Sequence, residues 1–79
     1  MKLPRDLSGA NLIRALMRLG YEQTRQTGSH VRMTISVPRQ AHLTVPLTRA
    51  IPAGTLAALI KNVAIQLETT VDDILSKIG

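Results

Sequence analysis

The apolar pattern of this chain changes its period twice, and these changes restrict the fold more than any other feature of the sequence. Residues 8–20 repeat at helical spacing, residues 21–47 alternate with a period of two, and helical spacing returns after Arg49. A period near 3.6 indicates a helix with one buried face, whereas a period of two indicates a half-buried strand. We therefore predict the order α-β-β-β-α-α. This is an α+β fold, with a three-stranded antiparallel sheet and helices on one of its faces.

The first predicted helix, residues 8–20, has a signal at each end. Ser8 is suited to cap its start, and Gly20 occupies the position where a left-handed residue commonly closes a helix. The apolar positions between them are Leu12, Ile13, Leu16, Met17 and Leu19. Arg14 and Arg18 fall together on the opposite face, which we interpret as an ordinary solvated helix face.

Two strands are predicted from alternation. The apolar positions of the first are Val31, Met33, Ile35 and Val37, and those of the second are Leu43, Val45 and Leu47. Directly opposed residues of a hairpin share a face, so Val37 is expected opposite a residue such as Leu43. The turn between the strands then needs an odd number of residues or a bulge. This register places His30, Arg32 and His42 on the polar face.

A third strand is predicted over Tyr21–Gln26, joined to the next strand through Gly28-Ser29. Two helices are predicted after the sheet. Pro52 fits the first turn of the longer helix, whose apolar stripe is Leu56, Leu59, Ile60, Val63 and Leu67. Thr69 or Thr70 is suited to cap the shorter helix, whose stripe is Val71, Ile74, Leu75 and Ile78.

The length of 79 residues predicts one domain, residues 1–79, with a single modest core. The chain has no Cys, which excludes disulfides, a thiolate nucleophile and a Cys-based zinc site. No apolar stretch approaches the roughly 18 residues of a membrane span, and no apolar signal core follows Met1-Lys2. We therefore expect a protein of the reducing cytoplasm that uses no cofactor and does not enter the membrane.

The charge of the chain is positive and unevenly distributed. The formal net charge is +5, because 10 Lys and Arg face 5 Asp and Glu. Residues 1–50 carry eight of these cations, Lys2 included, and only two carboxylates. Most of the cations are Arg, whose forked donors suit phosphate oxygens, so the basic half indicates a polyanionic partner such as nucleic acid. Tyr21 is the only aromatic residue, which argues against a platform for stacking bases.

His30 and His42 are the residues best suited to chemistry. Two histidines are too few for a zinc site, and Ser29 projects away from the adjacent His30 in a strand, which argues against acyl transfer. RNA cleavage is different, because the 2′-hydroxyl is the nucleophile and the protein supplies only proton transfer and positive charge. A polar face that carries His30, Arg32 and His42, with Arg25 on the neighbouring strand, is compatible with such cleavage. The spacing alone is equally consistent with a simpler interpretation, in which both histidines occupy strand positions that tolerate any polar residue.

Gly54-Thr55, at the start of the longer helix, is a second candidate site. Free backbone N–H groups and a hydroxyl at a helix start suit a phosphate oxygen. The simpler interpretation is that Gly54 allows a close approach to the sheet and Thr55 caps the helix. Lys61 then either adds charge to the site or is merely solvated.

Four segments of the chain, taken in order, resemble the HicA (YcfA-like) toxin family. They are Leu7-Ser8-Gly9 with a helix ending Leu19-Gly20-Tyr21, Arg25-Gln26-Thr27-Gly28-Ser29-His30, His42-Leu43-Thr44-Val45-Pro46, and Ile51-Pro52-Ala53-Gly54-Thr55-Leu56. Each segment is unspecific alone, but their order and spacing cover nearly the whole chain. The most specific part is Gly-Ser-His at the opening of a strand, followed by a His-containing strand that ends in Val-Pro and by a helix that starts with Pro-x-Gly-Thr-Leu.

The resemblance implies a fold like that of double-stranded-RNA-binding domains, metal-independent cleavage of mRNA, and neutralisation by a HicB-type antitoxin. It implies that His30, the histidine of Gly-Ser-His, is catalytic, and that no metal or cofactor is used. The RNA contacts are then expected from the strand and helix positions singled out above, namely Arg25, Ser29, Arg32, His42, Gly54, Thr55 and Lys61. His42 is expected to contribute to binding or electrostatics.

The chain departs from the family pattern in three places. Val31 follows Gly-Ser-His where many relatives carry a second His, the hairpin at Pro38–Ala41 is short, and the last dozen residues form an additional helix. These differences bear on substrate contacts and partner docking. A non-catalytic double-stranded-RNA binder and a domain that only binds the antitoxin are the alternatives with the same fold.

Overall fold

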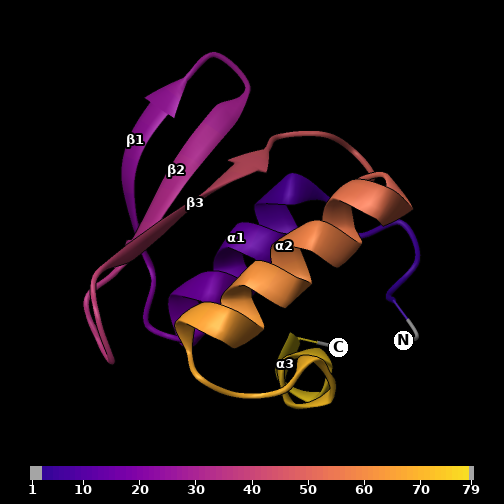
Figure 1. Cartoon of the computed structure of the whole chain (residues 1–79). Coiled ribbons are helices and arrows are strands. Elements are labelled where there is room, and N and C mark those ends of the chain that lie inside the picture. Colours follow the sequence, from indigo (N-terminus) through magenta and orange to yellow (C-terminus); the bar gives the residue numbers. More distant parts are fainter. Residues whose placement is uncertain (1–2, 79) are drawn as a thin grey trace.

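The computed structural model describes residues 3–78 and confirms the predicted order of elements. Within these residues the elements are α1 (Gly9–Arg18), β1 (Glu22–Thr27), β2 (His30–Ile35), β3 (Ala41–Pro46), α2 (Ala53–Gln66) and α3 (Val71–Ile78). The strands form one antiparallel sheet in the order β1-β2-β3. Figure 1 shows the helices gathered on one side of this sheet. Residues 1, 2 and 79 of the expected domain, Lys2 among them, lie outside the described residues.

The core lies between the inner face of the sheet and the helices. The sheet contributes alternate residues of β2 and β3, namely Val31, Met33, Ile35, Leu43 and Val45, all of them buried. The helices contribute Leu12, Leu16, Leu56, Ile60, Val63 and Ile74, also buried. α3 packs against α1 and α2. No helix among the described residues is long and apolar enough to cross a membrane.

Both ends of α1 are fixed by the predicted residues. The Ser8 side chain accepts a hydrogen bond from the Asn11 N–H at 3.1 Å, which satisfies one N–H group that the first turn leaves unpaired. At the other end Gly20 has φ 109°, and the Tyr21 N–H donates to the Leu16 carbonyl at 3.0 Å. This six-residue closure is a Schellman motif, which favours glycine at its left-handed position.

The hairpin between β1 and β2 turns through Gly28 and Ser29. Gly28 has φ 59°, the positive value that the first position of a tight hairpin turn requires. Thr27 pairs with His30 directly beyond this turn. The pairing then shifts between Gln23 and Arg25, so that Thr24 forms a bulge in β1.

The β2–β3 hairpin has a different register from the one predicted. Met33, not Val37, lies opposite Leu43, and Val37 is 76% exposed in the connecting loop of residues 36–40. The prediction for Val37 was wrong because strand pairing ends at Ile35, whereas the alternation of apolar residues continues in the sequence to Val37. The odd loop length was predicted, and it places His30, Arg32 and His42 on the polar face. Leu47 is 37% exposed and follows the end of β3.

α2 begins one residue later than the sequence indicated. Pro52 is its N-cap residue and makes no side-chain cap, while Thr55 lies inside the first turn. The interpretation of Thr55 as a cap was therefore wrong. In the short helix α3, Thr70 is the cap, since its hydroxyl accepts from the Asp73 N–H at 3.1 Å.

Candidate nucleic-acid interface

The outer face of the sheet, the one turned away from the helices, carries the polar residues of all three strands. Directly opposed residues of an antiparallel sheet share a face. The register therefore places three rows across the outer face, listed from β1 through β2 to β3 as Thr27, His30 and Pro46, then Arg25, Arg32 and Thr44, then Glu22, Thr34 and His42. Arg32 thus lies between the levels of the two histidines.

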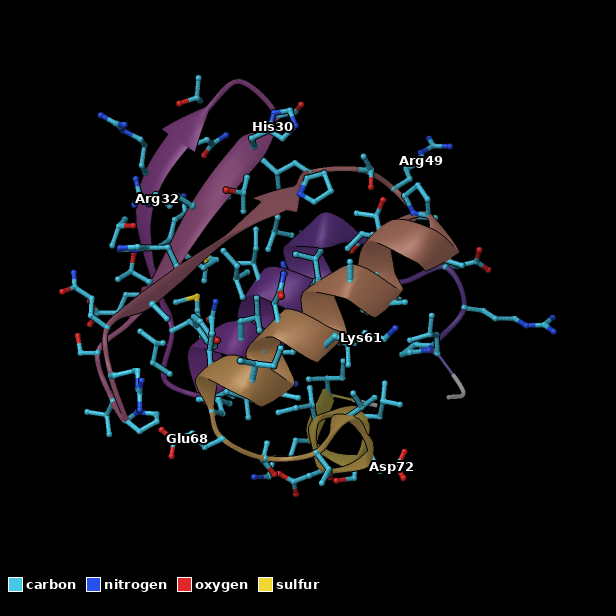
Figure 2. The ribbon with its side chains drawn as sticks, in the orientation of Figure 1. His30, Arg32, Arg49, Lys61, Glu68 and Asp72 are labelled. Carbon is cyan, nitrogen blue, oxygen red and sulfur yellow. The ribbon has the colours of Figure 1, made fainter. Side chains whose placement is uncertain are left out.

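His30 is the first residue of β2 and stands at the edge formed by the β1–β2 turn. Its side chain is exposed, and it extends from the end of the strand (Figure 2). The turn is tied to the rest of the sheet, because the Ser29 carbonyl accepts a hydrogen bond from the Leu47 N–H at 2.6 Å. His30 is therefore an accessible imidazole on a well-anchored backbone.

Arg25 and Arg32 lie directly opposite each other on β1 and β2. Like charges in such a pair destabilise a sheet. The ion pairs of the described residues join Arg39 to Glu68 and Lys77 to Asp73, so neither of the two opposed guanidinium groups has a carboxylate partner there. The two arginines form a cationic site in the row of the outer face that follows the His30 row.

His42 is held in place by a chain of hydroxyl groups. Its Nδ1 lies 2.8 Å from the hydroxyl oxygen of Thr34, which lies 2.8 Å from that of Thr24. The Thr24 hydroxyl donates to the Arg32 carbonyl at 3.3 Å. The bulge in β1 brings Thr24 into this chain, so a local irregularity of the edge strand orients an imidazole two strands away.

The backbone of His42 is held from the helix side. The Gln66 side-chain amide donates to the His42 carbonyl at 2.8 Å, and the Gln66 side-chain oxygen accepts from the Tyr21 hydroxyl at 2.5 Å. Tyr21 is almost completely buried, and this burial raises its pKa to about 12. The Gln66 side chain therefore links α2 both to the edge of β3 and to the buried Tyr21 phenol, which stays protonated well above neutral pH.

A shallow hollow of about 290 Å³ opens on the outer face between these groups. It is lined by Thr24, Arg25, Arg32, Thr34, Gln40 and His42. Three of these are sequence-predicted site residues, namely Arg25, Arg32 and His42. Gln40 and the two threonines were not predicted. The alternation of β2 already placed Thr34 on the polar face, but nothing in the sequence indicated the bulge at Thr24.

The two histidines share the outer face but stand at different levels of it. His42 is level with Thr34, four residues along β2 from His30, which corresponds to about 13 Å along the backbone at roughly 3.3 Å per residue. Among the described residues, His30 does not line the hollow that contains His42, so the structure does not bring the two imidazoles together.

The predicted helix residues lie apart from the outer face. Gly54 and Thr55 are exposed in the first turn of α2, and Lys61 projects from the same helix on the far side of the sheet (Figure 2). The first helical bond is donated by Leu56, to the Pro52 carbonyl at 2.8 Å. The N–H groups before it are thus available to an anion. The hollow beside this turn is lined by Asp6 as well as Arg5, so it is not purely cationic.

No three His, Asp or Glu side chains among residues 3–78 lie close enough together to hold a metal ion. His30 and the start of α2 lie at the same end of the molecule, where Figure 2 also places Arg49. A negatively charged strand that crosses this end could contact them as well as the cationic outer face.

Comparison with known proteins gives one match. A family described as the HicA toxin of bacterial toxin-antitoxin systems matches residues 9–65, which run from the first residue of α1 to the last turn of α2. No curated protein and no solved structure matches the chain. α3 lies beyond the matched residues, while the outer sheet face and the start of α2 lie within them. The match spans well over half of the chain, which therefore belongs to the HicA toxin family of bacterial toxin–antitoxin systems.

Proposed function

We propose that this toxin is an endoribonuclease that cleaves mRNA without a metal ion and uses His30 for proton transfer. One observation carries the proposal. The Gly-Ser-His motif places His30, with an exposed imidazole, at the first position of β2. The opposed pair of Arg25 and Arg32 lies one row away on the same face. Histidine titrates near neutral pH, and arginine holds the phosphate backbone of the strand beside the reacting bond.

The reaction needs little from the protein, because RNA carries its own nucleophile. The 2′-oxygen forms a bond to the adjacent phosphorus, and the bond between phosphorus and the 5′-oxygen breaks. The 2′-hydroxyl loses a proton and the departing 5′-oxygen gains one. The products end in a 2′,3′-cyclic phosphate and a 5′-hydroxyl. His30 takes up the first proton or delivers the second, since a positioned histidine performs either role.

The RNA strand is proposed to contact residues from both layers of the fold. On the sheet side these are Arg25, Ser29, Arg32 and His42, and on the helix side they are Gly54, Thr55 and Lys61. The scarcity of cations near the start of α2, where Lys61 is the only one in the helix, favours cleavage over plain duplex binding. Binding is expected to weaken as salt rises, because each phosphate contact releases counterions.

The second partner is proposed to be a HicB-type antitoxin in the same cytoplasm. A toxin with a net charge of +5 is attracted to an acidic protein, and a partner that covers His30 would block cleavage. Size-exclusion chromatography with the product of the neighbouring gene tests this partnership. A complex at micromolar concentration is expected, and its absence would contradict the proposal.

The test of cleavage uses purified wild-type and His30→Ala protein with a long single-stranded RNA in EDTA. The wild-type protein should yield fragments that end in a 2′,3′-cyclic phosphate, and a single 2′-deoxy substitution at a mapped cleavage position should abolish the cut there. His30→Ala should leave the RNA intact while its circular dichroism matches the wild type. Intact RNA with both proteins would instead support a non-catalytic RNA-binding or antitoxin-binding domain.

A further inference from the structure

We propose that the hollow on the outer sheet face is a second nucleotide subsite, which holds a phosphate and a 2′-hydroxyl of the RNA strand away from the bond that His30 cleaves. The proposal rests on the RNA-directed function argued above. It assigns Arg25, Arg32 and His42 to a place on the substrate different from the scissile phosphate.

The arginine pair supplies the phosphate-binding half of the subsite. Arg25 and Arg32 are in register and line the same hollow, and no carboxylate of the described residues neutralises either one. A directly opposed cation pair costs stability in a sheet, and a bound anion removes that cost. Guanidinium groups match phosphate oxygens with two parallel hydrogen bonds, so one phosphodiester fits between them.

The hydroxyl chain holds one ring nitrogen of His42. Nδ1 lies 2.8 Å from the Thr34 hydroxyl oxygen, which lies 2.8 Å from that of Thr24, and either partner of each contact can be the donor. The chain therefore engages Nδ1 and leaves Nε2 as the ring nitrogen without a hydrogen bond among the described residues.

A polar side-chain atom beside a phosphate site distinguishes a nucleotide subsite from a plain anion site. The ribose 2′-hydroxyl both donates and accepts, so it can pair with His42 Nε2 in either tautomer, and this hydroxyl is the group by which a protein recognises RNA rather than DNA. Gln40, from the β2–β3 loop, also lines the hollow and adds an amide that can donate or accept. The subsite thus combines positive charge, which binds the RNA phosphate backbone, with hydrogen-bonding groups that recognise the ribose 2′-hydroxyl.

The hollow begins one row away from His30. The arginine row is two residues along β2 from His30, or about 7 Å at roughly 3.3 Å per residue, and His42 is one row further. Glu22 lies on β1 at the level of Thr34 and His42, but it lines a neighbouring hollow with Val37. The arginine row is therefore the place on this face for a phosphate that flanks the cleaved bond.

The test is a binding experiment on an uncleavable RNA, made so by a single 2′-deoxy nucleotide at the mapped cleavage position. A neutral methylphosphonate is placed at each other phosphate in turn, and affinity is measured for the wild type and for the double variant Arg25→Gln/Arg32→Gln. One methylphosphonate, at a phosphate that flanks the cut, should weaken wild-type binding about tenfold. The same substitution should cause no further loss with the double variant.

The ribose contact is read in the same way. A second 2′-deoxy substitution at the nucleotide held in the hollow should weaken binding to the wild type about fivefold and leave binding to His42→Ala unchanged. Arg14→Gln/Arg18→Gln removes the same charge from α1 and is the matched control. It should lower affinity equally for every modified RNA, with no single phosphate singled out.

The possible failures are distinguishable. If the losses from the arginine variants and from each neutral phosphate simply add, the subsite is overturned while cleavage by His30 stands. If the double variant binds RNA like the wild type but loses antitoxin affinity, the hollow is a protein-docking surface and the subsite is again overturned. If the wild type binds with the predicted coupling yet never cleaves RNA, the subsite stands and the proposed cleavage fails.

Discussion

The hydroxyl group of Thr34 lies 2.8 Å from Nδ1 of His42, and this contact joins the central strand of the sheet to its edge. The same hydroxyl lies 2.8 Å from that of Thr24 on the opposite edge strand. A single small side chain therefore connects all three strands across the outer face. Both of its contacts are on the half-exposed side of the sheet, so they orient groups on the surface without adding to the core.

Thr34→Val should release the His42 ring while preserving the fold. Valine has nearly the shape of threonine and a high strand preference, so the free energy of unfolding should change by about 1 kcal/mol or less. Nδ1 of His42 should lose its hydroxyl partner, and the resulting change in the ring-nitrogen signals is detected directly by long-range ¹H–¹⁵N NMR. Thr44→Val, on the same exposed face but outside the hydroxyl chain, is the control and should leave the His42 signals unchanged. Unaltered ring-nitrogen signals of His42 in Thr34→Val would contradict the account.

Gly9→Ala should be strongly destabilising. A Cβ at position 9 would lie 2.0 Å from the Pro46 carbonyl oxygen, a backbone atom that cannot move without displacing the end of β3. Overpacking of this kind costs about 1–3 kcal/mol or more. Gly54→Ala is the matched control, because no atom lies within 4 Å of its added Cβ, and it should cause no loss of stability. Urea unfolding of both variants gives the comparison, and equal midpoints would show that α1 does not approach β3 so closely.

Gly9 and Pro46 also show what the sequence could and could not reveal. The alternation of apolar residues predicted the sheet, its polar face and the position of His30 on it, because side-chain direction in a strand follows from period alone. Close contacts between distant segments carry no such signal. The approach of α1 to β3, the bulge at Thr24 and the tie from Gln66 to His42 all depend on tertiary packing. The sequence therefore predicted which residues of β2 share the polar face, but not how the groups on that face are divided along the sheet.

Glu68→Gly should stabilise the protein. Glu68 has φ 57° at the left-handed position that closes α2, where the Thr69 N–H donates to the Ala64 carbonyl at 2.9 Å. A non-glycine residue in this conformation costs about 1–2 kcal/mol, part of which glycine loses again to its freedom in the unfolded chain. The exposed ion pair from Arg39 to Glu68, at 3.6 Å, contributes little.

We expect a net gain of up to about 1 kcal/mol for Glu68→Gly, visible as a higher urea midpoint. Arg39→Ala separates the two effects, because it removes the ion pair and keeps the backbone. The free energy of unfolding of Arg39→Ala should stay within about 0.5 kcal/mol of that of the wild type. A loss of stability in Glu68→Gly that Arg39→Ala reproduces would mean that the ion pair, and not the backbone, dominates at this corner.

Tyr21→Phe should change how stability depends on alkaline pH. Burial raises the pKa of Tyr21 from 10.0 to about 12 in the folded protein. Between these values the unfolded chain releases a proton that the folded chain retains, so unfolding becomes easier as pH rises through this window. The loss amounts to roughly 2–3 kcal/mol at most. Tyr21→Phe lacks this proton and should lose less stability than the wild type between pH 10 and 12.

At neutral pH the same variant should be less stable by about 1 kcal/mol, because the hydrogen bond from the Tyr21 hydroxyl to Gln66 is lost. Urea unfolding at pH 7 and pH 11 measures both effects. All other titrating groups are common to the two proteins, so they cancel in the comparison. An equal loss of stability in both proteins as the pH rises would show that the pKa of Tyr21 is not raised in the folded protein.

The central claim is that His30 performs proton transfer and does not merely hold the RNA. The most direct measurement is the single-turnover cleavage rate of wild type, His30→Ala and His42→Ala, with protein in excess over RNA at saturating concentration, so that binding no longer limits the rate. The account predicts a rate for His30→Ala at least about a hundredfold below the wild type, and a rate for His42→Ala close to it. A His30→Ala rate equal to that of the wild type under saturation would contradict the catalytic role of His30.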